Sequence, residues 1–153
     1  MRANVEVLVV DDSDNDAALT LDSLRNAAPD VTVLRLSDGE QALHFLDATD
    51  GLVGRPGGLP KLVLLDLDMP GIDGIRVVES LRARPDLQQL PVVLWTSSGN
   101  PLSIERALRA GASAYRIKPA SLDAYRAEIN LIVQRWLQDG AIAISAAAAK
   151  RSA

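Results

Sequence analysis

The sequence contains no cysteine and no long apolar run. Without cysteine the chain cannot form disulfides, use a thiolate nucleophile or hold zinc through sulfur, and this composition fits a reducing compartment. No segment approaches the roughly 20 consecutive apolar residues that cross a bilayer. Residues 1–6 are polar, and the apolar run Val7–Val10 is too short for a signal peptide. We therefore expect a cytoplasmic protein with no membrane segment.

Basic residues are also in the minority, since 16 Lys and Arg stand against 20 Asp and Glu, for a formal net charge of −4. No cluster of Lys and Arg is present, so we expect no nucleic-acid partner. With 48% hydrophobic and 24% charged residues, the 153-residue chain has the composition and length of one soluble globular domain. Negative charge gathers in residues 11–16 and 66–73, and this distribution favours a cation site.

Short apolar runs alternate with segments of helical spacing along the chain. Runs rich in β-branched residues and leucine are typical of strands covered on both faces, and such strands form parallel sheets. The alternation predicts an α/β, doubly wound, flavodoxin-like fold with five helices and five parallel strands in the order 2-1-3-4-5. The predicted strands are Val5–Val10, Val31–Leu36, Leu62–Leu65, Val92–Trp95 and Ala114–Ile117.

Capping residues mark several helix ends. Ser37 with Glu40 predicts a capping box at the start of the second helix. Asn100 before Pro101 predicts the start of the fourth helix. Gly111 is well placed to end that helix in the left-handed conformation.

The last predicted helix is the longest, and Ser121 is its candidate cap. Its apolar stripe consists of Leu122, Tyr125, Ile129, Ile132, Val133 and Trp136. We assign residues 1–140 to a single domain with a Gly- and Pro-rich loop at residues 50–60. Residues 141–153 form a low-complexity tail.

Polar residues follow four of the five predicted strands. They are Asp11 and Asp12 after the first strand, Asp66 and Asp68 after the third, Thr96 after the fourth and Lys118 after the fifth. Because parallel strands end at one edge of such a sheet, we expect these side chains to gather there. Clustered carboxylates repel one another unless a cation offsets their charge, and oxygen ligands suit Mg²⁺. For Asp14 and Asp16 we favour a simpler interpretation, an interaction with the dipole of the first helix.

This set of groups indicates phosphoryl transfer. A carboxylate beside Mg²⁺ can attack phosphorus and form an acyl phosphate. The metal and the lysine would neutralise charge on the phosphoryl oxygens, and a hydroxyl would donate a hydrogen bond. Pro119 restricts the backbone of Lys118 to extended geometry and so helps to fix the direction of the lysine.

The motifs resemble the CheY-like receiver domain of two-component response regulators over roughly residues 5–138. The matching segments are VLVVDDS (7–13), LVLLDLDMPGIDG (62–74), VVLWTSS (92–98) and RALRAGASAYRIKP (106–119). The spacing agrees with the family pattern, with 30 positions from Asp66 to Thr96 and 22 from Thr96 to Lys118.

The resemblance implies a phosphoacceptor and its metal site. Asp66 would accept the phosphoryl group from a sensor histidine kinase. Mg²⁺ would be bound by Asp11, Asp12, Asp66 and the backbone carbonyl of Asp68. The domain would not be an enzyme in the usual sense, because its only reactions would be Mg²⁺-dependent self-phosphorylation and autodephosphorylation.

The resemblance also implies a switch. Thr96 and Lys118 would contact the phosphoryl group, and Tyr115 would turn inward as Thr96 moves toward the phosphate. This change would alter the surface made by helix 4, strand 5 and helix 5. Asp68, where related regulators often have asparagine, and Ser98 lie at positions that tune the lifetime of the phosphorylated state.

A narrower resemblance is to stand-alone regulators paired with phytochrome-type sensor kinases. It rests on the long loop before the third strand and on the final helix ending in RWL (135–137). It implies a homodimer through the last strand and final helix. Tyr125, Trp136 and Leu137 would contribute to this dimer, with ordinary core packing as the alternative for such an aromatic stripe. Because the sequence ends after one receiver domain, we expect no attached output module.

Two alternatives remain open at this stage. Asp66-Leu67-Asp68 also resembles the nucleophile motif of haloacid-dehalogenase-type phosphohydrolases, although the acidic pair comes early and no late pair follows Lys118. A receiver-like adaptor that binds partners without taking phosphate is the second alternative. His44, the only histidine, is expected to be a surface or structural residue and not a phosphorelay group.

Overall fold

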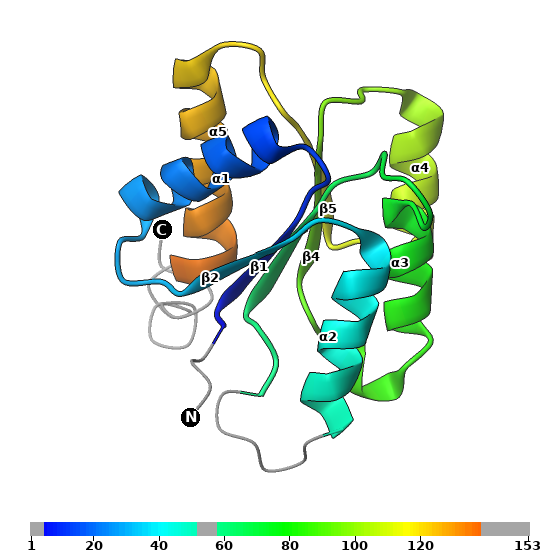
Figure 1. Ribbon diagram of the computed structural model, residues 1–153. Coiled ribbons are helices and arrows are strands. Elements are labelled where there is room, and N and C mark those ends of the chain that lie inside the picture. Colours follow the sequence, from blue (N-terminus) through cyan, green and yellow to red (C-terminus); the bar gives the residue numbers. More distant parts are fainter. Residues whose placement is uncertain (1–4, 52–57, 139–153) are drawn as a thin grey trace, which may run out of the picture.

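The computed structural model describes residues 5–51 and 58–138, and it contains one five-stranded sheet flanked by helices (Figure 1). The strand order is β2-β1-β3-β4-β5, and all neighbouring strands pair in parallel. Figure 1 shows α1 and α5 on one face of the sheet and α2, α3 and α4 on the other. The predicted doubly wound architecture with five parallel strands is confirmed.

The elements follow one another in strict alternation. The strands are β1 (Val7–Val10), β2 (Val33–Leu36), β3 (Leu62–Leu65), β4 (Val92–Thr96) and β5 (Ala114–Ile117). The α-helices are α1 (Asp14–Ala27), α2 (Gly39–Gly51), α3 (Gly74–Arg82), α4 (Pro101–Ala110) and α5 (Leu122–Val133). A short 3₁₀ turn (Pro85–Leu87) follows α3, and a π turn (Gln134–Gln138) follows α5. Two strands begin two residues later than predicted, and β4 is one residue longer.

The three central strands carry the core. Every residue of β1, β3 and β4 is buried, as expected for strands that have helices on both faces. Val10 lies opposite both Leu36 and Leu65, and Leu65 lies opposite Leu94. This register brings the residues that follow β1 and β3 to the same edge of the sheet, side by side.

Three of the four predicted helix signals are confirmed. Asn100 accepts a hydrogen bond from Leu102 N ahead of α4, and Ser121 accepts one from Ala124 N ahead of α5. Gly111 ends α4 with a φ of 113°, in the left-handed region that favours glycine.

The predicted capping box of Ser37 and Glu40 is wrong by one position. The α2 helix begins at Gly39, and the carboxylate of Asp38 accepts the hydrogen bond from Gln41 N at 2.8 Å. Asp is as good a cap as Ser, and the chain uses the second of two adjacent capping residues. Ser37 instead donates its N–H and its hydroxyl to the side chain of Gln41.

The apolar stripe of α5 is confirmed for its central residues and wrong at its start. The buried members are Tyr125, Ile129, Ile132 and Val133, and Trp136 is half-buried against the same cluster. Leu122 is 46% exposed. It is the first residue of α5, where Figure 1 shows the helix extending beyond the ends of the strands.

Two sequence predictions fall partly or wholly outside the described residues. The predicted loop 50–60 begins within α2, which continues to Gly51, and residues 52–57 of that loop are not described. The predicted tail at 141–153 also lies outside, and the domain boundary at 140 stays a prediction. No helix among residues 5–51 and 58–138 has the length and apolar character needed to cross a membrane.

Gly74, the first residue of α3, lies against the end of β3. A Cβ atom at this position would be 2.4 Å from the carbonyl oxygen of Asp66 and 3.0 Å from Leu94 Cδ1. The close approach lets Gly74 N donate a hydrogen bond of 2.8 Å to the carbonyl of Leu67. The glycine therefore fixes the loop that follows Asp66.

We expect Gly74→Ala to lower the free energy of unfolding by about 1–3 kcal/mol, because the added methyl group must displace backbone and not a flexible side chain. Gly99→Ala is the matched control, since a Cβ there would meet only Ile117 Cδ1 at 3.4 Å. Urea unfolding of the three proteins measures the difference. Equal stabilities for the two variants would contradict the close contact.

Candidate functional site

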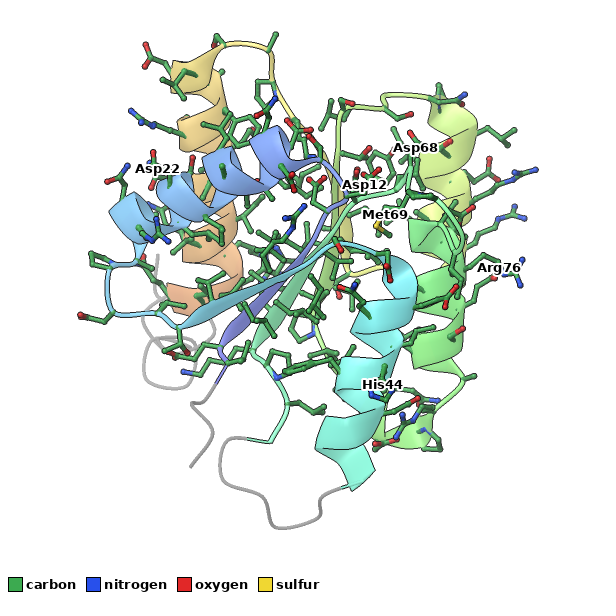
Figure 2. The ribbon with its side chains drawn as sticks, viewed as in Figure 1. Asp12, Asp22, His44, Asp68, Met69 and Arg76 are labelled. Atoms are coloured by element: carbon green, nitrogen blue, oxygen red, sulfur yellow. The ribbon has the colours of Figure 1, made fainter. Side chains whose placement is uncertain are left out.

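Three carboxylates converge at the carboxyl edge of the sheet. Asp11, Asp12 and Asp66 each offer one oxygen, and these oxygens all lie within 4.8 Å of one another. Asp11 and Asp66 are buried, whereas Asp12 is exposed. Figure 2 shows Asp12 and Asp68 at this same end of the sheet. A compact set of carboxylate oxygens with one side open to solvent fits a hard divalent cation that keeps some of its water ligands.

Lys118, which follows β5, brings one ammonium group to these carboxylates. Its Nζ atom lies 2.6 Å from Asp11 Oδ2, 3.3 Å from Asp16 Oδ2 and 4.0 Å from Asp66 Oδ1. Burial alone would lower the pKa of Lys118, but the hydrogen bond to Asp11 and the charges of the surrounding carboxylates raise it above its ordinary value. The lysine therefore stays charged.

Asp66 follows β3 and is the most strongly perturbed acid of the site. Burial raises its pKa from 3.8 to about 6, while the charge of Lys118 opposes the shift and that of Asp11 adds to it. Its Oδ1 atom accepts a hydrogen bond from Leu67 N at 2.9 Å. The group is ionised at neutral pH but remains poorly solvated, which is the condition of a reactive carboxylate.

Thr96 ends β4 and is buried, and it is linked to Lys118 through the backbone. Lys118 N donates a hydrogen bond of 2.7 Å to the carbonyl of Thr96. The Thr96 hydroxyl oxygen accepts one of 3.3 Å from Ser98 N. Tyr115 is half-buried, and its hydroxyl donates to the carbonyl of Ser98 at 2.7 Å. Thr96 and Tyr115 thus both hydrogen-bond to the backbone of Ser98, in the loop after β4.

Asp16 and Arg35 make contacts at the site that the sequence did not predict. Asp14 and Asp16 both lie in the first turn of α1, as the dipole interpretation requires. The carboxylate of Asp16 also contacts Lys118. Arg35 of β2 pairs with Asp14, and it donates two hydrogen bonds, of 3.1 and 2.8 Å, to the backbone carbonyl of Asp11. Its only signal in the sequence is that it is the one charged residue of an otherwise apolar strand.

A buried hydrogen-bonded group of side chains surrounds Trp95, the residue before Thr96. The Trp95 indole N–H donates to the Thr20 hydroxyl at 3.1 Å, and this hydroxyl lies 2.7 Å from that of Tyr125. The Trp95 and Tyr125 rings meet edge to face with centroids 5.0 Å apart. This arrangement ties β4 to α1 and α5, and sequence reasoning missed Thr20 because its partners are distant along the chain.

The environment of Tyr125 decides between the two interpretations of this residue, dimer contact and core packing. Tyr125 is only 3% exposed, so it belongs to the core and does not contribute to a dimer surface. Trp136 and Leu137, the other two residues predicted for that surface, are half-buried. His44 lies on α2 toward the opposite end of the sheet from Asp12 (Figure 2), and it is exposed, as expected for a surface histidine.

We expect Thr20→Val to lower the free energy of unfolding by about 1–3 kcal/mol, because the indole N–H and the phenol would lose their buried partner. Thr20→Ser keeps the hydroxyl and should retain most of the stability that Thr20→Val loses. Thermal or urea unfolding measures both variants. A Thr20→Val variant as stable as the wild type would show that the hydroxyl contributes nothing.

Asp66→Asn should raise the free energy of unfolding of the metal-free protein by about 1–3 kcal/mol at pH 7.5. Because the folded-state pKa lies above 3.8, the folded protein binds the proton more tightly, and stability falls as pH rises from about 4 to about 6. The gain should therefore be smaller at pH 5. Urea unfolding at the two pH values measures it, and a less stable variant at pH 7.5 would be the contrary result.

Comparison with known families places these features in context. Residues 7–130 match the family model of the response regulator receiver domain. Response regulator Rcp1 of Synechocystis sp. is 30% identical over 86% of this chain and 88% of its own length. The probable methanogenesis regulatory protein FilR2 of Methanothrix harundinacea is 31% identical over 86% of this chain and 83% of its own.

Solved structures agree with this match. The phosphorylated cyanobacterial phytochrome response regulator RcpA has a TM-score of 0.77 at 28% identity, covering 88% of this chain and 95% of its own. The Mn²⁺-bound form of Rcp1 has a TM-score of 0.75 at 30% identity, covering 86% and 93% of the two chains. The acidic cluster at the carboxyl edge fits the divalent metal site of such domains. The chain belongs to the response regulator receiver domain family.

Proposed function

We propose that this receiver domain accepts a phosphoryl group on Asp66 from a sensor histidine kinase, with Mg²⁺ bound beside it. The observation that carries the proposal is the meeting of Asp11, Asp12, Asp66 and Lys118 from three different strand ends. Receiver domains are signalling modules, and their phosphoryl donors are histidine kinases.

The proposed metal ligands are Asp11, Asp12, Asp66 and the backbone carbonyl of Asp68. Three carboxylate oxygens within 4.8 Å of one another offer the hard ligands that Mg²⁺ prefers. When bound, the metal supplies charge neutralisation for the phosphoryl oxygens. The extra carboxylate of Asp68 is exposed, and it adds negative charge next to this position.

Three side chains of this domain take part in the phosphoryl transfer. A carboxylate oxygen of Asp66 forms a bond to phosphorus as the bond from phosphorus to the donor's imidazole nitrogen breaks, which yields an acyl phosphate. The Lys118 ammonium, 4.0 Å from Asp66 Oδ1, neutralises charge on the transferred group. The Thr96 hydroxyl, now an acceptor for Ser98 N, donates a hydrogen bond to a phosphoryl oxygen.

The response is a change in the surface of α4, β5 and α5. Tyr115 is hydrogen-bonded to the loop after Thr96, so a movement of that loop alters the environment of Tyr115. The large apolar residues that are most exposed among the described residues all lie on or at these elements, namely Leu102, Leu108, Ile117, Leu122 and Leu131. An exposed apolar face of this kind supports signalling or homodimerisation through β5 and α5.

The kinase is proposed to be of the phytochrome type. The support is the similarity to Rcp1 and to the phytochrome response regulator RcpA, with alignments that cover most of each chain. A cytoplasmic location and the absence of a nucleic-acid partner complete the proposal, and both rest on composition and charge. The family match leaves the phosphohydrolase alternative without support.

Acetyl phosphate with Mg²⁺ should label Asp66, and the bond should be sensitive to hydroxylamine. Asp66→Asn should abolish the label while the variant remains folded, because the amide cannot act as the nucleophile. Mass spectrometry of peptides locates the modification, and circular dichroism checks the fold.

Three results would count against the proposal. Labelling at another residue would contradict the assignment of Asp66. Failure of the folded wild type to take any label would favour the adaptor alternative. Turnover of p-nitrophenyl phosphate would favour a phosphohydrolase.

A further inference from the structure

Lys118 is shared between carboxylates of two kinds. Asp11, Asp12 and Asp66 form the trio of carboxylates at the candidate metal site. Asp16 does not belong to this trio. Nevertheless Asp16 Oδ2 lies 3.3 Å from the Lys118 ammonium, closer than the 4.0 Å to Asp66 Oδ1. Of the carboxylates that contact Lys118 within the described residues, Asp16 is therefore the one that stays available when a cation occupies the trio.

A cation on the trio changes the forces on the lysine. The Lys118 side chain is only 4% exposed, so bulk water does little to screen it from a nearby positive charge. Its strongest contact, 2.6 Å to Asp11 Oδ2, is to a carboxylate that the metal would neutralise. Breaking a buried ion pair is strongly unfavourable, so a carboxylate outside the trio that pairs with Lys118 favours metal binding.

We infer that Asp16 is a positioning residue that holds the Lys118 ammonium at the edge of the site while a divalent cation occupies Asp11, Asp12 and Asp66. This inference rests on the proposed function. The lysine then remains close to Asp66, and it does not compete with the metal for Asp11.

The position of Asp16 is well fixed. Its backbone N–H donates to the Ser13 hydroxyl at 3.2 Å, within the cap of α1. Its carbonyl accepts a hydrogen bond of 3.4 Å from the hydroxyl of the buried Tyr125. The first turn of α1 is thus anchored on α5, and the carboxylate reaches Lys118 from a rigid element.

Asp14 provides a matched control on the same helical turn. Its side chain is 93% exposed and pairs with Arg35, whereas that of Asp16 is 42% exposed and pairs with Lys118. Replacing either residue by asparagine removes one negative charge and one favourable interaction with the helix dipole. Only the change at Asp16 removes a partner of the lysine.

The test is the affinity for Mg²⁺, measured by the change of backbone amide signals in NMR spectra of the full chain. Asp16→Asn should weaken Mg²⁺ binding by a factor of about 3 to 10 relative to the wild type, the size expected for a partly buried ion pair. Asp14→Asn should weaken it by less than about twofold. Asp16→Ser, a second variant without the carboxylate, should behave as Asp16→Asn does.

The same comparison in a Lys118→Ala background separates positioning from general loss of charge. Without the lysine, Asp16→Asn should cost no more affinity than Asp14→Asn, because a coupling energy needs both partners. If Asp16→Asn and Asp14→Asn are equal in the wild-type background, the inference is wrong and the proposed function stands. If the wild type binds no Mg²⁺, the proposed metal site itself fails.

Discussion

The structure depends on one buried ion pair, between Asp11 after β1 and Lys118 after β5. Their charged atoms are 2.6 Å apart, and their side chains are 2% and 4% exposed. Burying two charges is costly unless the geometry and the remaining hydrogen bonds compensate. Here Asp11 Oδ1 also accepts a hydrogen bond from Ser13 N. The pair brings opposite charges together across the central strands at the edge where Asp66 emerges.

The apolar sheet makes this arrangement possible. Because β1, β3 and β4 are fully buried, their ends lie in rigid register and deliver Asp11, Asp66 and Thr96 to neighbouring positions. Low solvation then raises the pKa of Asp66 to about 6. The pKa of Lys118 is raised despite its burial, because of the hydrogen bond to Asp11 and the surrounding carboxylates. The burial that lowers stability thus leaves a poorly solvated carboxylate at Asp66. Binding of a cation or transfer of a phosphoryl group would stabilise it.

Local pattern was enough to predict the sheet and the main groups of the site. The five apolar runs lie in an alternating order that allows few topologies, and parallel strands must end at a common edge. The positions of Asp11, Asp12, Asp66, Thr96 and Lys118 follow from that constraint.

The contacts that sequence reasoning missed join residues far apart in the sequence. Arg35 supports the carbonyl of Asp11 from β2, and Thr20 accepts from Trp95 across 75 positions. Neither partner can be recognised from its own neighbours in the chain. The burial of Tyr125 and the contact of Asp16 with Lys118 have the same origin, since both depend on how α1 and α5 pack against each other.

A crystal structure of the full chain with Mg²⁺ and beryllofluoride tests the central claim most directly. The account predicts the beryllium bonded to a carboxylate oxygen of Asp66, the metal on Asp11 and Asp12, and Lys118 and Thr96 in contact with fluorine atoms. Beryllofluoride bound away from Asp66, or a metal ion that does not touch Asp11, Asp12 and Asp66, would contradict it.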